Sequence, residues 1–152
     1  MILRMMPESV SDHWDELKVH IAKSLPEGER SDETLNGILA GLLRNQIQMW
    51  LSYDSQDNNK VNAVALFTQI EDPFKGEKNL LVYTINRLTE MDHETTLRMY
   101  LEGIEGVRKL MKAGGYKQLV GYIDEENDNL LRRAKQFGAK LRWHWAIDMT
   151  GD

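Results

Sequence analysis

Two spacings of apolar residues divide the chain into predicted strands and helices. Alternating apolar and polar residues, or short apolar runs, are typical of strands, whereas apolar residues three or four positions apart indicate one face of a helix. The predicted strands cover residues 2–6, 47–53, 61–70, 80–88, 119–123 and 141–149. The predicted helices cover residues 12–25, 32–43, 93–113 and 127–137. This mixture of strands and helices predicts an α/β or α+β domain.

Polar residues, prolines and glycines mark the ends of these segments. Pro7 stops the first strand because it cannot donate to a ladder of hydrogen bonds. Ser11 and Ser31 are suited to cap the first two helices. Gly138 follows the last helix, where a left-handed residue commonly ends a helix. Turn-forming residues at 55–60 predict an antiparallel hairpin between the strands on either side.

Length and composition place further bounds on the protein. With 152 residues the chain fits one domain, residues 1–152, and it contains no cysteine for disulfides or thiolate metal sites. The apolar run before Pro7 is too short for a signal peptide or a membrane span, so we expect a cytoplasmic protein that is not embedded in a membrane. A net charge of −5 argues against nucleic acid as a partner.

Few side chains suggest a catalytic or metal site by their spacing alone. His13 and His20 are seven residues apart, but no carboxylates complete a metal motif, so we predict no metal. His93 has acidic neighbours, and polarity at the start of a helix explains it best. Glu71 and Asp72 end a strand, where they either supply a general base or begin a turn; the turn is the favoured interpretation.

The predicted order of elements, β-α-α-β-β-β-α-β-α-β, resembles that of the GNAT superfamily of N-acetyltransferases. In that family the late helix commonly begins with asparagine and runs about eleven residues to a glycine. The spacing of Asn127, Leu130, Leu131, Ala134 and Gly138 is similar. The resemblance implies one domain with a mixed, mostly antiparallel central sheet and helices on both faces.

The resemblance also implies a cofactor site. Acetyl-CoA would lie where the strand at 80–88 and the strand at 116–124 splay apart, with its diphosphate at the start of the following helix, since a helix N-terminus concentrates unpaired N–H groups. The cofactor-binding residues that it implies are Asn86, Thr95, Thr96 and Asn127.

Two positions depart from the family pattern. Active members usually carry a glycine-rich loop before the helix that binds the diphosphate, whereas residues 89–96 contain no glycine and include Glu90, Asp92 and Glu94. These carboxylates would repel phosphates. Many members also use a tyrosine four residues before the glycine as a general acid, and this chain has Ala134 there.

Two functions follow as alternatives. The first is an acyl-CoA-dependent N-acyltransferase with a degenerate diphosphate loop, acting on a small-molecule or peptide amine. The second is a catalytically inactive GNAT-like protein, of the kind encoded by phages or prophages, that serves as a binding or structural module. Aromatic side chains on predicted strands would suit a homodimer or another protein partner, although core packing is the favoured interpretation; they are Trp50, Trp143 and Trp145.

Overall fold

The computed structural model describes residues 1–54, 56–57, 60–122, 128–136, 138–140, 147 and 149–150. The chain divides into two units, Met1–Gly121 and Tyr122–Asp152, which are described separately. The first unit contains β1 (Ile2–Met5), α1 (Pro7–Asp12), α2 (Trp14–Ser24), a 3-10 turn η1 (Glu27–Glu29), α3 (Asp32–Leu43), β2 (Ile47–Tyr53), β3 (Val61–Asp72), β4 (Glu77–Arg87), α4 (His93–Gly114) and β5 (Leu119–Gly121). The second contains α5 (Asp128–Gln136).

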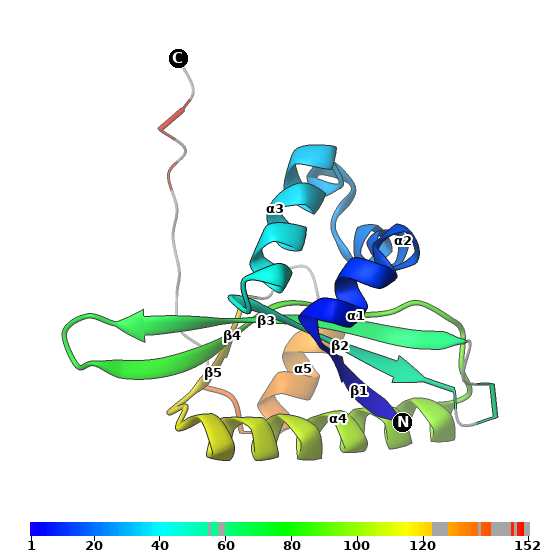
Figure 1. Ribbon diagram of the computed structural model, residues 1–152. Helices are drawn as coiled ribbons and strands as arrows, with labels where there is room; N and C mark the ends of the chain where they lie inside the picture. Colours follow the sequence, from blue (N-terminus) through cyan, green and yellow to red (C-terminus); the bar gives the residue numbers. More distant parts are fainter. Residues whose placement is uncertain are drawn as a thin grey trace. The chain divides into compact units, whose positions relative to one another are not determined.

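Five strands of the first unit form one sheet in the order β1-β2-β3-β4-β5. Strands β1 to β4 pair antiparallel with their neighbours, and β5 pairs parallel with β4. Figure 1 shows α1, α2 and α3 on one face of this sheet and α4 on the other. The predicted mixed, mostly antiparallel sheet with helices on both faces is confirmed.

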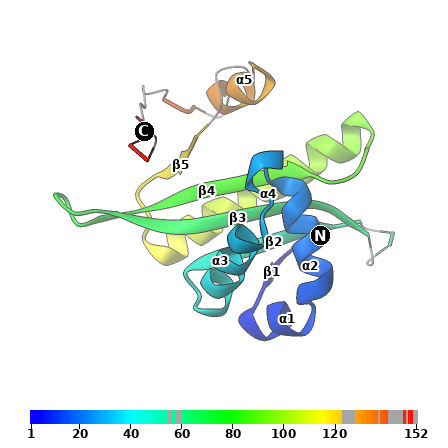
Figure 2. The same ribbon diagram turned by 90° about the horizontal axis from the view of Figure 1, so that it is seen from above.

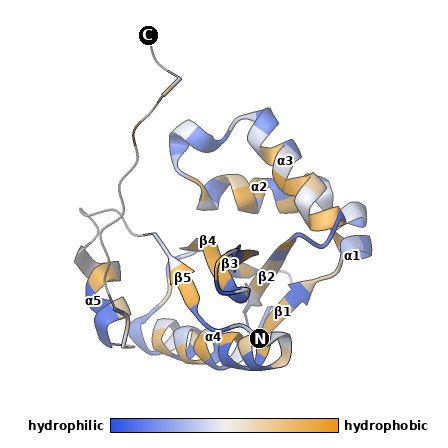
Figure 3. Ribbon diagram, turned by 90° about the vertical axis from the view of Figure 1, so that its left-hand side faces the viewer, coloured by the Kyte–Doolittle hydropathy of each residue, from blue (hydrophilic) through white to orange (hydrophobic). Residues whose placement is uncertain are grey.

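The main core lies between the sheet and the first three helices. Met49 and Leu51 of β2 and Leu66 of β3 are fully buried, and they share one face of the sheet because alternate residues of a strand point the same way. Val10, Leu17 and Ile21 pack against them from α1 and α2. Figure 3 shows the apolar segments of α2 and α3 together with those of the central strands.

The opposite face of the sheet is covered by α4 and is less completely buried. Trp50 alternates with Met49 and Leu51 and is half-buried on this face. On α4 itself, Leu97 and Leu101 remain 51% and 55% exposed. The long hairpin of β3 and β4 extends past the ends of the neighbouring strands, as Figure 2 shows from above.

The prediction of the first helix, over residues 12–25 with Ser11 as its N-cap, was wrong in where the helix starts and in which residue caps it. The region contains two helices, α1 and α2. Helix α1 begins at Pro7, because the missing N–H of proline costs nothing in the first turn of a helix. Ser11 lies inside α1 and caps no helix. Ser31 is the N-cap of α3, since its hydroxyl accepts the Thr34 N–H at 3.2 Å.

The later segments follow the prediction closely. Strand β4 begins three residues earlier than predicted. Helix α4 ends at Gly114 and is capped by Gly115, whose φ of 68° is the left-handed conformation that favours glycine. The predicted strand at 141–149 falls almost entirely outside the described residues. No helix in the described part of the chain is long and apolar enough to cross a membrane.

Candidate functional site

Strands β4 and β5 are paired over only three positions. Leu80, Leu81 and Val82 lie opposite Leu119, Val120 and Gly121. The pairing is extended at one end by two backbone hydrogen bonds, from Leu80 N–H to Gln118 O at 2.9 Å and from Lys117 N–H to Lys78 O at 2.9 Å. Strand β4 continues to Arg87, whereas β5 ends at Gly121. The described pairing of β4 with β5 therefore ends at Val82 and Gly121.

A β-bulge in β4 follows the last residue that pairs with β5. Leu66 of β3 pairs with Thr84 and Phe67 pairs with Val82, so Tyr83 has no opposite residue. Such a bulge bends the strand and increases its twist, and bulges are common next to active sites. The side chains of Tyr83 and Ile85 are about half exposed, at 48% and 51%.

Beyond the bulge, one edge of β4 has no strand partner within the described residues of the first unit. The Leu88 N–H donates to Asn62 O at 2.7 Å, which fixes the alternation of backbone groups. Thr84 and Asn86 then direct their backbone groups toward β3, and Ile85 and Arg87 direct theirs away from it. An unpaired strand edge is a template for any extended chain that carries amides.

The loop between β4 and α4 is anchored by one buried residue. Asn62 of β3 is 4% exposed and accepts twice from this loop: its carbonyl from the Leu88 N–H, and its side-chain Oδ1 from the Thr89 hydroxyl at 3.0 Å. These two bonds hold the start of the loop against the sheet.

The N-terminus of α4 is capped by its own carboxylate. Asp92 Oδ1 accepts the Thr95 N–H at 2.7 Å, and this hydrogen bond is the main cause of the lowered pKa of the Asp92 carboxyl. Two arginines near this end are paired with carboxylates of the same segment: Arg87 Nη2 lies 3.9 Å from Glu90 Oε2, and Arg98 Nη2 lies 3.0 Å from Glu94 Oε1. Segment 87–98 carries two arginines and three carboxylates, so it is net negative with His93 neutral.

The structure separates the residues predicted to bind the cofactor. Thr95 and Thr96 lie in the first turns of α4, where the Thr95 N–H is taken by Asp92 and the Thr96 side chain is 7% exposed. Asn86 Nδ2 donates to the Lys23 carbonyl of α2 at 3.4 Å, which places it on the face covered by the first three helices. Asn127 lies outside the described residues.

The other polar candidates behave as ordinary structural groups. Asp72 Oδ1 accepts from the N–H groups of Phe74 and Lys75 at 2.9 and 3.2 Å, so its turn interpretation is confirmed. His13 Nδ1 lies 3.0 Å from Ser9 O, whereas His20 Nε2 lies 3.9 Å from a Glu16 carboxylate oxygen. Among the described residues, no group of three or more histidines or carboxylates is placed to hold a metal ion.

In the second unit, α5 ends as the sequence predicts. Gly138 has a left-handed φ of 84°, and its N–H donates to Lys135 O at 3.0 Å. Ala134 is partly buried, and its carbonyl accepts the Ala139 N–H at 3.0 Å. Ala134 therefore offers only a methyl group at the position where the sequence resemblance led us to look for a general acid.

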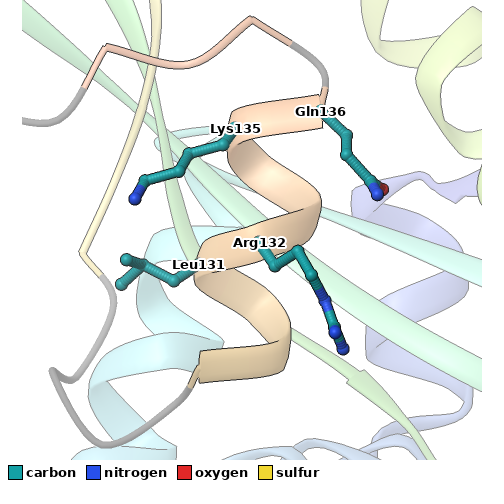
Figure 4. A pocket seen from close by; sticks show the side chains of 4 residues that line it. All are labelled: Leu131, Arg132, Lys135 and Gln136. Carbon is teal, nitrogen blue, oxygen red and sulfur yellow. The ribbon is translucent and has the colours of Figure 1, made fainter.

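The surface of α5 carries a shallow hollow of about 480 Å³. Figure 4 shows its four lining side chains, Leu131, Arg132, Lys135 and Gln136, which come from successive turns of this one helix. Two of them are basic, so the hollow would suit an anionic group better than a cationic one.

A larger hollow of about 840 Å³ lies in the first unit, at the end of β3 near the C-terminus of α3. Its lining includes Arg44, Gln46, Glu71 and Tyr116. The Tyr116 hydroxyl donates to Gln69 Oε1 at 3.4 Å, and the Thr68 hydroxyl donates to Gln46 O at 2.9 Å. The sequence did not point to this hollow, because its residues come from three separate segments, 37–48, 68–71 and Tyr116, with no shared motif.

No protein-family model matches the sequence, and no curated protein matches it. Solved acetyltransferase structures nevertheless match nearly the whole chain. A probable acetyltransferase has a TM-score of 0.77 at 9% identity, over 100% of this chain and 99% of the other. AAC(6')-Iy in complex with the bisubstrate analogue CoA-S-monomethyl-acetylneamine has 0.74 at 11% identity, over 100% and 98%. Ribosomal-protein-alanine N-acetyltransferase from Brucella melitensis biovar Abortus 2308 has 0.65 at 10% identity, over 97% and 98%.

At these identities the similarity is one of fold. The chain has the α/β fold of GNAT acetyltransferases, as the order of its elements predicts. The bulge at Tyr83 is the feature that sequence reasoning missed, since it depends on how two strands pair and leaves no mark in the apolar pattern.

Proposed function

Starting from the GNAT fold, we propose that this protein is an N-acyltransferase that takes its acyl group from a CoA thioester. The acceptor is a small-molecule or peptide amine, and the protein works in the cytoplasm as one continuous domain of residues 1–152. When bound, the thioester would supply an activated acyl carbon: the amine nitrogen would form the amide and lose a proton, and the sulfur would leave as the CoA thiol. The names of two matched structures indicate amine acceptors: one is an aminoglycoside N-acetyltransferase and the other a ribosomal-protein-alanine N-acetyltransferase.

The end of the described β4–β5 pairing at Val82 is the observation that carries this proposal. It leaves the backbone groups of Ile85 and Arg87 directed away from β3, with no strand across from them among the described residues of the first unit. The pantetheine arm of CoA is an extended chain with two amides, and such a chain pairs with a strand edge as another strand would. The strand edge therefore fits this part of the cofactor.

A second candidate is a GNAT-like module without catalytic activity. Two observations favour it: the α4 N-terminus is closed by Asp92, and Ala134 supplies no acid for the departing thiolate. In this alternative the fold is kept for contacts with a protein partner or a second copy of the chain.

Calorimetry and thermal unfolding with acetyl-CoA separate the two candidates. A ligand that binds the folded state alone stabilises it by RT ln(1 + [L]/Kd), about 2.7 kcal/mol at a hundredfold excess over Kd. For a chain of this size each kcal/mol raises Tm by roughly 2–4 °C. We expect heat of binding and a raised Tm. If millimolar acetyl-CoA gives neither heat of binding nor a raised Tm, the acyltransferase proposal is wrong and the non-catalytic module remains.

A further inference from the structure

The start of α4 is poorly suited to bind a diphosphate. Asp92 is exposed and holds the Thr95 N–H at 2.7 Å, so the donor that would meet a phosphate oxygen is already used by a carboxylate. The two arginines nearest this end, Arg87 and Arg98, are paired with Glu90 and Glu94. A phosphate approaching here meets net negative charge and no unused side-chain cation of segment 87–98.

The loop that leads into α4 is also held in place. Asn62 accepts from the Leu88 N–H and from the Thr89 hydroxyl, and Asp92 closes the helix four residues after Leu88. The loop contains no glycine whose N–H groups could wrap around an anion. Rearrangement into a phosphate-binding loop would have to break the cap and these anchoring bonds together.

By contrast, the edge of β4 offers groups that suit the uncharged part of the same cofactor. The backbone N–H and C=O groups of Ile85 and Arg87 point away from β3. This follows from the Leu88 N–H to Asn62 O hydrogen bond and from the regular register between Ala63 and Leu66. The two amides of the pantetheine arm can form hydrogen bonds with backbone groups of this kind. The two halves of the proposed donor site thus differ: the strand edge attracts the arm, and the helix start repels the diphosphate.

Resting on the proposed function, we propose that this protein selects its acyl donor through the pantetheine arm, so that acyl-pantetheine thioesters serve about as well as acyl-CoA, and that Asp92 sets this preference. Its carboxylate occupies the position at α4 where the donor's phosphate would bind. The substrate class therefore extends to pantetheine thioesters that lack the nucleotide.

The test compares CoA with pantetheine, which carries the same thiol arm without the phosphates, by calorimetry on the full chain. We expect the wild-type dissociation constants to agree within about threefold. Asp92→Gly removes the charge and frees the Thr95 N–H, while glycine remains an acceptable N-cap. This variant should bind CoA roughly tenfold more tightly and pantetheine unchanged. Asp92→Ser removes the charge but retains a capping hydroxyl, so it should show a smaller gain for CoA.

Asp32→Asn is the matched control, because it removes one negative charge from the first turn of another helix, α3. It should leave both affinities unchanged, and the unliganded Tm of each variant reports whether it folds. If wild type binds CoA at least tenfold more tightly than pantetheine, or if Asp92→Gly leaves the ratio unchanged, the donor preference is wrong while the acyltransferase stands. If no variant binds either ligand, both proposals fall.

Discussion

Gly41 of α3 lies directly against Ile47 of β2. A Cβ atom built on Gly41 would come within 2.5 Å of Ile47 Cδ1 and 2.7 Å of its Cγ1, closer than real side-chain contacts allow. The glycine therefore permits the end of α3 to approach the start of β2. Gly37, one turn earlier on the same helix, has nothing within 4 Å of such an atom.

This contrast predicts opposite effects of the same substitution at the two glycines. Gly41→Ala should lower the free energy of unfolding by about 1–3 kcal/mol, because the added methyl overpacks against Ile47. Gly37→Ala should raise it by up to about 1 kcal/mol, because alanine is the better helix former. Urea unfolding of both variants measures the difference. Equal effects of one sign would contradict the close approach.

The strand edge of β4 predicts a specific loss of donor binding. Ile85→Pro removes one backbone N–H that is directed away from β3, and proline is tolerated where a strand's N–H faces away from its neighbour. Since one hydrogen bond contributes about 0.5–1.5 kcal/mol net, the affinity for acetyl-CoA should fall roughly three- to tenfold. Calorimetry measures the loss.

Ile85→Val is the control for this variant, because it keeps the N–H and changes the side chain by one methylene. Its affinity for acetyl-CoA should match that of the wild type, and unliganded Tm values show whether either variant disturbs the sheet. Undiminished binding by a folded Ile85→Pro would show that the donor does not pair with this edge.

His20 predicts a loss of stability on mild acidification. Burial lowers the pKa of its imidazole, Lys23 lowers it further and Glu16 raises it, and its Nδ1 is buried with no hydrogen-bond partner among the described residues. The folded pKa lies below the unfolded value of about 6.5, so the unfolded state takes up the proton first. The stabilisation is complete above about pH 6.5 and declines as the pH falls through the folded pKa.

Urea unfolding between pH 7.5 and 5 measures this dependence. His20→Gln should flatten the decline, whereas His13→Gln, at the exposed junction of α1 and α2, should leave it in place. A wild-type stability that does not change over this range would be inconsistent with an imidazole kept neutral by burial.

The cap of α3 predicts different effects of two serine substitutions. Ser31→Ala removes the acceptor of the Thr34 N–H and should cost about 1 kcal/mol of unfolding free energy. Ser11→Ala, inside α1, should change it by less than about 0.5 kcal/mol, because no helix depends on Ser11 as a cap. Thermal unfolding distinguishes them, and a larger cost at Ser11 would restore it as a cap.

Local patterns predicted most elements because each depends on neighbours in sequence. The face of Leu17, Ile21 and Leu25 identified α2, and Gly138 takes the left-handed conformation expected after α5. The start of the first helix failed because Pro7 has two local meanings, the end of a strand and the first turn of a helix. Only packing decides between them.

The candidate site was less predictable, since its features depend on distant segments. The resemblance predicted a cofactor site between β4 and β5, but the bulge at Tyr83 follows from the register of β4 against β3. Asn86 has a polar side chain suited to a ligand, yet its partner is the Lys23 carbonyl, 63 residues away. No pattern of local residues shows which side of a sheet such a group will face.

The three-position pairing of β4 with β5 also bears on the order of folding. Strands β2, β3 and β4 are joined by short turns, whereas β5 reaches β4 only after all of α4. Since closing the longer connection costs more entropy, we expect β5 to dock last and to open first in hydrogen exchange. Until it docks, the whole outer edge of β4 is unpaired, which makes incompletely folded chains prone to associate through it.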